Sequence, residues 1–162
     1  MKPQSRLQLA KAARASMSEA SPYELSVRAS GIHRLGVFAA QRIPAGRRVI
    51  EYAGERISRR ETRRRFLEGS GGRSRRLNYL ACLDSYWAID GAVGGNGAEL
   101  INHSCDPNLR LRRIRNRLWL ISLRAIRRGE ELVYDYHFSK NAQRVPCHCG
   151  ASKCRGSINV VE

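Results

Sequence analysis

The stretch Cys147-His148-Cys149-Gly150-Ala151-Ser152-Lys153-Cys154 decides how the end of this chain must fold. Its C-x-C-x4-C spacing places three thiols in one short loop, and a structural zinc ion takes four ligands in a tetrahedron. The fourth ligand must come from elsewhere, and Cys105 in Asn102-His103-Ser104-Cys105-Asp106-Pro107-Asn108 is the best candidate. One zinc ion held by Cys105, Cys147, Cys149 and Cys154 would fix the C-terminal tail onto a distant loop. Three unpaired thiols, or a redox pair without metal, are the alternatives.

The length and composition suit a single folded domain. A chain of 162 residues with 42% hydrophobic residues can bury one core. Five cysteines without a signal-peptide pattern favour a reducing compartment and metal binding over disulfides. Cys82 is then left over, and we expect it to be a small buried residue in a strand. No apolar run approaches membrane-spanning length, so we expect a soluble monomer without a membrane partner.

The charge of the chain is strongly positive but unevenly distributed. It carries 30 basic and 14 acidic residues, a net charge of +16, and most of the basic residues are arginine. Such an arginine-rich surface attracts polyanions, and DNA is the candidate partner, although a GC-rich genome would also favour arginine codons. Residues 77–109 contain no lysine or arginine but hold Asp84, Asp90, Glu99 and Asp106. We expect this acidic segment to draw a cationic group toward Asn-His-Ser-Cys.

The pattern along the chain indicates short strands and turns. Residues 1–22 read as a loose or partly helical basic arm. Strands are expected at 24–29, 36–40, 49–53, 79–83, 86–89, 109–114, 118–123 and 131–134. Ser58 followed by Glu61 forms a capping box that begins a helix ending near Glu68. The glycine-rich loop 91–97 lacks the G-x-G-x-x-G spacing of a dinucleotide site. This content predicts a mostly β architecture of small sheets.

Several motifs then follow one another in a fixed order. The chain contains Gly36-Val37-Phe38-Ala39, Ile43-Pro44-Ala45-Gly46, Ile50-Glu51-Tyr52-Ala53-Gly54-Glu55, Gly95-Asn96, Leu100-Ile101 joined to the Asn-His-Ser-Cys segment, Gly129-Glu130-Glu131-Leu132-Val133-Tyr134-Asp135-Tyr136, and the cysteine-rich tail. Together they resemble the SET-domain protein lysine methyltransferases with a post-SET zinc tail, in particular the trithorax and mixed-lineage-leukaemia branch. The resemblance extends from about residue 24 to residue 159.

The resemblance implies both a fold and an activity. It implies a SET fold of several small β-sheets, in which a C-terminal segment threads beneath a loop as a pseudoknot. The arm would span 1–22, the SET domain 23–138, and the linker with the zinc-bound post-SET tail 139–162. The implied reaction transfers a methyl group from S-adenosylmethionine to a lysine of a basic protein or peptide, such as a histone. The location would be a bacterial cytoplasm or, for a secreted or eukaryotic protein, the nucleus or chromosome.

Three tyrosines match the family's catalytic positions. Tyr136 is similar to the catalytic tyrosine, while Tyr134 and Tyr79 match the other tyrosines of the lysine channel. A lysine reacts only after losing its proton, and an aromatic channel that desolvates the amine lowers its pKa. We therefore expect the tyrosines to position and polarise the amine rather than act as strong bases, with most of the rate coming from alignment. Ordinary core aromatics are the alternative interpretation.

Other residues match the family's cofactor site. Asn102 and His103 resemble the pair that binds S-adenosylmethionine, and Tyr79 also lies at this site. The first cofactor loop contributes His33, Leu35 and Gly36, and the zinc tail contributes His148 by its position over the adenine.

Two positions depart from the family pattern. The family often has Arg-Phe where this chain has Glu99-Leu100, and related members place a basic or aromatic residue at Leu35. Both changes are expected to weaken cofactor binding. The alternative function is therefore a non-catalytic SET-like module that binds nucleic acid or chromatin-like proteins.

Overall fold

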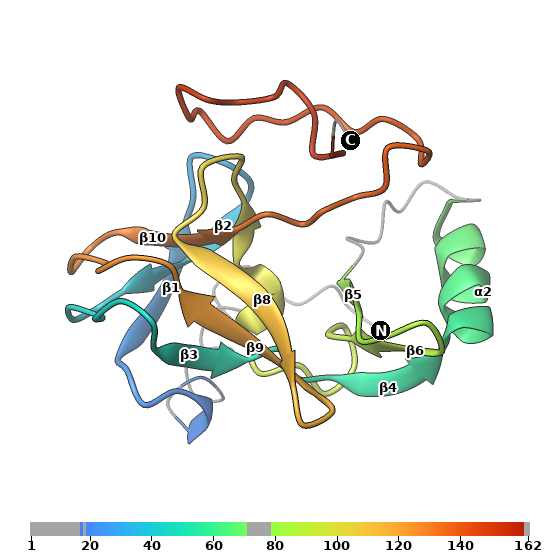
Figure 1. Cartoon of the computed structure of the whole chain (residues 1–162), viewed down its shortest axis with the longest axis horizontal. Coiled ribbons are helices and arrows are strands. Elements are labelled where there is room, and N and C mark those ends of the chain that lie inside the picture. The colour runs from blue at the N-terminus through green and yellow to red at the C-terminus, as the bar shows by residue number, and fades with distance from the viewer. Residues whose placement is uncertain (1–16, 18, 71–78, 161–162) are drawn as a thin grey trace, which may run out of the picture.

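The computed structural model describes residues 17, 19–70 and 79–160 and consists mainly of short strands in two sheets (Figure 1). The larger sheet has the strand order β1-β2-β10-β8-β9-β3, with β7 paired to β10 outside this path. Its strands are β1 (Leu25–Ala29), β2 (Leu35–Ala39), β3 (Arg48–Glu51), β7 (Asn102–His103), β8 (Leu109–Ile114), β9 (Arg117–Ser122) and β10 (Glu131–Tyr134). The expected mostly β architecture of small sheets is confirmed.

The smaller sheet has the order β4-β6-β5 and stands beside the single long helix of the described residues. Its strands are β4 (Glu55–Ser58), β5 (Leu80–Cys82) and β6 (Trp87–Asp90). The helix α2 (Arg59–Ser70) follows β4, and the 3-10 helix η1 (Ala98–Leu100) comes after β6. The backbone N–H of Glu61 donates to Ser58 Oγ at 3.1 Å, so the predicted helix start is confirmed. In the part of the chain described, no helix is both long and apolar enough to cross a membrane.

The hairpin β8–β9 shows how local sequence sets the register. Ile114 pairs with Arg117 across the two-residue turn Arg115-Asn116. Both turn residues have positive φ, 47° and 64°, which is the geometry of the primed turns that match strand twist. Alternate residues of β9 are buried, Leu118 and Leu120 among them, and face the core of the domain.

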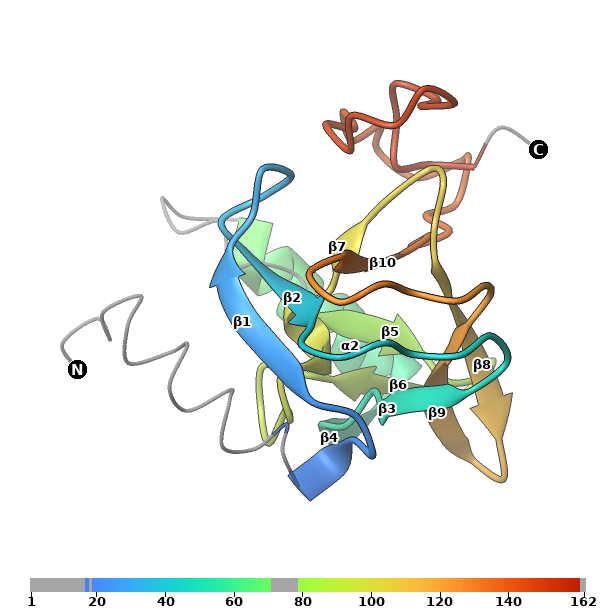
Figure 2. The ribbon, with the colours of Figure 1, turned by 90° about the vertical axis from the view of Figure 1, so that its left-hand side faces the viewer.

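Strand β10 lies at the centre of the topology. It pairs antiparallel with β2 and parallel with both β7 and β8. It therefore runs past the segment that joins β7 to β8 before the chain enters the tail, as the expected threading requires. Figures 1 and 2 show the tail crossing one end of the domain. Backbone bridges Phe138–Asn159 and Pro146–Ser157 fold the tail back on itself.

Of the arm expected at 1–22, residues 1–16 and 18 lie outside the described residues. Its end is not loose. Met17 is 1% exposed and belongs to the hydrophobic core. It packs so closely against Gly97 that a Cβ added at Gly97 would lie 2.7 Å from Met17 Cγ. Ser21 Oγ donates to the Val49 carbonyl at 2.7 Å. The last residues of the arm therefore form part of the core.

Sequence patterns missed two strands and misplaced one side chain. No strand was expected at the positions of β4 or β7. Cys82, expected in the core, lies in a strand as predicted but is exposed. Alternation explains this error, because Ala81 occupies the buried side of edge strand β5 and its neighbour must face outward.

Candidate functional site

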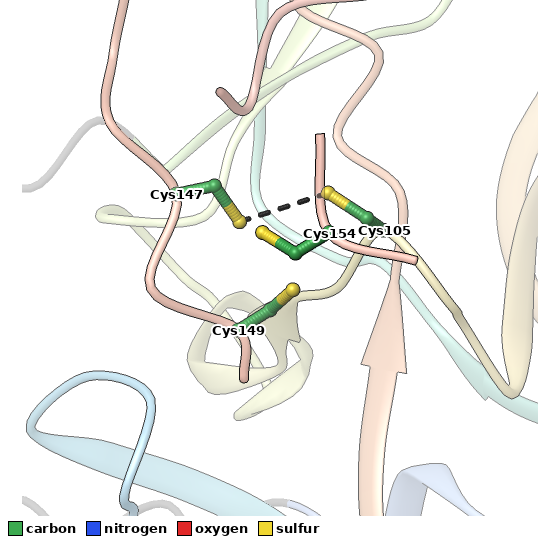
Figure 3. Close-up of side chains that lie close together, drawn as sticks. All are labelled: Cys105, Cys147, Cys149 and Cys154. Carbon is green, nitrogen blue, oxygen red and sulfur yellow. Dashed lines mark hydrogen bonds between the residues drawn. The ribbon is translucent and has the colours of Figure 1, made fainter. Parts of the chain in front are cut away.

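The four predicted zinc ligands converge although one comes from the loop after β7 and three from the tail. The sulfur atoms of Cys105, Cys147, Cys149 and Cys154 all lie within 4.8 Å of one another (Figure 3). Cys105 Sγ and Cys147 Sγ are 3.7 Å apart. A tetrahedron with zinc–sulfur bonds of about 2.3 Å has edges of about 3.8 Å, so the donor set is compatible with one zinc ion.

Burial and neighbouring hydrogen-bond donors shift the pKa values of the clustered cysteine thiols. Burial raises the pKa of Cys147 to about 12 and also raises that of Cys105. Burial opposes ionisation of Cys149 as well. Hydrogen bonds from the backbone N–H groups of Cys105 and Ala151, together with those from the thiols of Cys147 and Cys154, outweigh it and bring the Cys149 pKa to about 6. The backbone N–H of Arg155 lies 3.4 Å from Cys105 Sγ. These N–H groups suit thiolate ligands, which metal binding requires.

His103 connects this cysteine cluster to the tyrosines. Its Nε2 lies 3.5 Å from Cys105 Sγ, and its Nδ1 accepts a hydrogen bond of 3.1 Å from the Tyr136 backbone N–H. Acceptance at Nδ1 places the ring proton on Nε2, facing the sulfur. Burial lowers the pKa of His103, with Arg155 acting in the same direction against Asp135, so the ring is neutral at neutral pH. One side chain thus contacts both parts of the site.

Tyr134 and Tyr136 lie side by side at the end of β10, with ring centroids 4.8 Å apart. Tyr136 Oη donates to the Ile101 carbonyl at 2.9 Å, and the His103 ring meets the Tyr136 ring edge-on at 5.3 Å. Burial raises the pKa of both phenols, so both stay neutral at neutral pH. Neutral hydroxyls suit positioning and polarisation rather than strong-base chemistry.

Tyr79 and Tyr52 complete the aromatic cluster. After burial, the Tyr79 phenol contributes to the raised pKa of Tyr136. Tyr52 Oη donates to the Tyr79 carbonyl at 2.8 Å, and burial, with Tyr134 next, raises the Tyr52 pKa. Sequence reasoning quoted Tyr52 within a motif but gave it no role, because a tyrosine in a buried strand looks like ordinary core.

Asn102 fixes residues 33–35 to β10. Its side-chain amide donates to the carbonyls of His33 (3.3 Å) and Leu35 (3.0 Å) and to Glu131 Oε1 (2.9 Å). Gly36 is required beside this contact, since a Cβ there would collide with the Glu131 carboxylate. The structure thus brings together Asn102, His103, Leu35 and Gly36, while the His33 side chain is exposed.

His148 is also exposed and is not one of the four clustered donors, as expected. Two hollows in the described surface contain none of the candidate residues; they are lined by Ser58, Arg60, Glu61, Arg63 and Arg64, and by Arg42, Arg124, Ala125, Arg127 and Glu130. The tyrosine site is therefore identified by its residue types and their contacts, and not by a surface hollow.

The acidic segment at 77–109 does not present the expected anionic surface. Asp90 is buried and ion-paired with Arg65 at 2.5 Å. Asp84 pairs with Arg113 at 3.1 Å. Arginines from outside the segment thus neutralise two of its four carboxylates, which a count along the sequence could not reveal.

Comparisons with known proteins agree with this fold. The SET domain family matches residues 34–137, and the chain belongs to this family. Similar relatives include human histone-lysine N-methyltransferase 2B, 36% identical over 88% of this chain, and the "H3 lysine-4 specific" histone-lysine N-methyltransferase of Schizosaccharomyces pombe, 41% identical over 80% of it. SET methyltransferases use S-adenosylmethionine. Similarity to trithorax-type enzymes, as the motifs indicated, is confirmed.

A solved structure titled "Structural basis for the product specificity of histone lysine methyltransferases" has the same fold. It matches with a TM-score of 0.73 and 31% identity, covering 86% of this chain and 58% of that one. The chain spans only 5% of the human relative and 14% of the yeast one.

Proposed function

We propose that this chain is an S-adenosylmethionine-dependent protein lysine N-methyltransferase. The substrate is a histone or another basic, nucleic-acid-associated protein, and the site of action is the chromosome. One observation carries the proposal: Tyr136, Tyr134, Tyr79, Asn102 and His103, which come from three separate stretches of sequence, gather beside the tail held at the cysteine cluster. Membership of the SET family and the names of the similar relatives support the same activity.

The tyrosines would act on the lysine side of the reaction. Bound in this site, S-adenosylmethionine supplies a methyl group on a positively charged sulfur. The ring faces of Tyr134 and Tyr136 favour a neighbouring cation and exclude water from the amine. Tyr136 is held by its bond to the Ile101 carbonyl, so its hydroxyl has a fixed position. Alignment of the amine with the methyl group is then the main source of the rate.

The binding residues have separate tasks. Asn102 holds the carbonyls of His33 and Leu35 through its amide, so this side chain shapes the first cofactor loop. His103 holds the Tyr136 backbone in register with the cysteine cluster. Gly36 and Tyr79 border the same region, and exposed His148 is available to cover the adenine.

One structural zinc ion would hold the tail. Cys105, Cys147, Cys149 and Cys154 would be its ligands, and the distances among their sulfurs support this set. A filled four-sulfur site leaves no open coordination position, so the metal would serve folding rather than chemistry.

The deciding experiment incubates the full chain with labelled S-adenosylmethionine and histone H3, other histones and a bacterial DNA-compacting protein. Transfer to lysine that Tyr136→Phe reduces by about a hundredfold or more would establish the enzyme. Binding of the same proteins without any transfer would instead support the non-catalytic module.

We also propose that an arginine face on the larger sheet binds double-stranded DNA. Arg110 and Arg112 lie directly opposite Ile121 and Trp119 on one face of β8–β9, and Arg48 of the neighbouring β3 lies 5.6 Å from the centre of the Trp119 ring. All three arginines are exposed, and none has a carboxylate partner within the described residues. Free guanidinium groups on a protein of net charge +16 suit phosphates.

This second proposal is tested with two triple variants that remove the same total charge from different surfaces. Arg48→Ala/Arg110→Ala/Arg112→Ala should bind a short DNA duplex more weakly, and the slope of log affinity against log salt should fall by about one for each phosphate that the face no longer binds. Arg42→Ala/Arg127→Ala/Arg128→Ala removes the same charge from another exposed surface. Equal weakening in both triple variants would show general charge attraction and defeat the proposal.

A further inference from the structure

Glu99 differs from most carboxylates in the described part of this arginine-rich chain. Among these residues, Glu131 is also partly buried without an ion pair, but it accepts hydrogen bonds from Ser30 Oγ and the Asn102 amide, whereas Glu99 accepts only from backbone N–H groups. Asp84, Asp90, Glu51, Glu130 and Asp135 each pair with an arginine. Glu99 is partly buried, and within the described residues it has no ion pair with arginine, lysine or histidine. A carboxylate that has lost water and has no counter-ion is a costly arrangement, which a bound cation would relieve.

The glycines before η1 bring this carboxylate close to the backbone. Glu99 Oε2 accepts a hydrogen bond of 2.8 Å from the Gly97 N–H. A Cβ on Gly95 would lie 2.8 Å from both the Glu99 carboxyl carbon and Oε2. A Cβ on Gly91 would lie 2.8 Å from Glu99 Cβ and 3.3 Å from Tyr52 Oη. Glu99 and Tyr52 therefore flank the same glycine, and side chains at these positions would displace the carboxylate.

The same carboxylate lies next to the tyrosine site. Tyr52 is bonded to the Tyr79 carbonyl at 2.8 Å. After burial, the charge of Glu99 contributes to the raised pKa of Tyr79, and it also contributes to that of Tyr52. Burial raises the pKa of Glu99 itself. Because Tyr79 borders both the lysine channel and the cofactor site, a cation entering either one would come near Glu99.

We propose that the Glu99 carboxylate binds a cationic amine that enters the tyrosine site, either the ammonium of the acceptor lysine or the amino group of the methyl donor. This inference rests on the proposed function. It concerns a position where this chain departs from the family pattern, which often has arginine, the opposite charge.

The test uses Glu99→Gln in the full chain. Glutamine keeps the volume and one side-chain oxygen that can accept from the Gly97 N–H, so only the charge is removed. The matched control is Glu24→Gln, an exposed carboxylate without an ion pair in the described part of the chain. Equilibrium binding is measured by calorimetry for S-adenosylhomocysteine and for methylthioadenosine, which both carry a neutral sulfur but of which only the first has the amino-acid end. It is also measured for an H3 amino-terminal peptide with either lysine or norleucine at its fourth position.

Loss of about tenfold in affinity for the lysine peptide but not for the norleucine peptide would identify the acceptor ammonium as the bound cation. The same loss for S-adenosylhomocysteine but not for methylthioadenosine would identify the donor amino group. Unchanged affinities for all four ligands would overturn the inference, and so would tighter binding of S-adenosylhomocysteine, which would reveal repulsion by Glu99. If the wild-type chain binds these ligands but transfers no methyl group, the proposed function is defeated and the inference about Glu99 stands. If the wild-type chain binds none of these ligands, the proposed function and the inference are both overturned.

Discussion

His103 Nε2 lies 3.5 Å from Cys105 Sγ, so the proposed zinc ligand and the tyrosine site share one side chain. The opposite ring nitrogen holds the Tyr136 backbone at 3.1 Å. Contacts of this kind orient metal ligands in other proteins and are sensitive to loss of the metal. His103 also contacts Tyr136, the residue expected to face the amine. Loss of the metal from the tail should therefore also disturb the tyrosine site.

The first prediction concerns zinc removal. Stripping the metal with a chelator should release the tail from Cys105, disturb His103, and abolish methyl transfer, and adding zinc back should restore it. Metal analysis of the folded chain should give about one zinc ion per molecule. Full activity in chain with far less than one zinc ion would contradict both the assignment and the coupling.

The second prediction separates the coupling from the metal. His103→Ala removes the contacts to Tyr136 and Cys105 but none of the four sulfurs. We expect zinc content to stay near one ion per chain, stability to fall by about 1–3 kcal/mol because the Tyr136 N–H loses its partner, and transfer to fall sharply. Thermal unfolding and metal analysis on the same sample check this. A variant that loses its zinc completely would show that His103 supports the metal centre itself.

The third prediction concerns the ion pair that joins β10 to the tail. Arg155 donates to both oxygens of Asp135, at 2.7 and 3.1 Å. Arg155→Ala should destabilise the tail by about 2 kcal/mol and increase its hydrogen exchange. The control is Arg144→Ala, an exposed residue of the same tail. Equal exchange in both variants would show that the pair does not hold the tail.

The same pair predicts a pH effect with a defined sign. Burial would raise the pKa of Asp135, but Arg155 and the His137 N–H outweigh it and hold the pKa below its usual range. A depressed pKa stabilises the fold fully above the ordinary value of about 3.9, and this contribution is lost as pH falls through the lower folded value. NMR titration should give Asp135 a higher pKa in Arg155→Ala than in the wild-type chain.

The sequence predicted the chemistry better than the packing. Four cysteines, a helix start at Ser58 and a hairpin around Asn116 each follow from spacing or turn chemistry, which local sequence specifies. The exposure of Cys82 and the pairing of Asp90 with Arg65 depend on which residues meet across strands and helices. Local sequence does not specify these contacts between distant residues. That Glu99 has no ion pair within the described residues follows only from the positions of the other charged groups in the fold.

The fifth prediction is that Tyr134 limits how many methyl groups are added. Tyr134 is 8% exposed, its ring lies 4.8 Å from that of Tyr136, and its hydroxyl has no hydrogen-bond partner within the described residues. Such a hydroxyl narrows the channel and is free to hold an ordered water. A methylated amine must displace that water and rotate a methyl group into its place, losing hydrogen bonds that the methyl group cannot replace. The first methyl transfer escapes this penalty, so the chain alone should yield mainly monomethyl-lysine.

Tyr134→Phe removes the hydroxyl and keeps the ring, so it should admit di- and trimethylation while leaving the first transfer active. Tyr136→Phe makes the same atomic change one side chain away, where the hydroxyl is bonded to the Ile101 carbonyl, and it should instead nearly abolish transfer. This opposite outcome for two neighbouring hydroxyls separates control of the product from catalysis. Mass spectrometry of the product peptides distinguishes the methyl states directly. Abundant trimethyl-lysine from the unmodified chain, or an unchanged product distribution in Tyr134→Phe, would refute the role given to Tyr134.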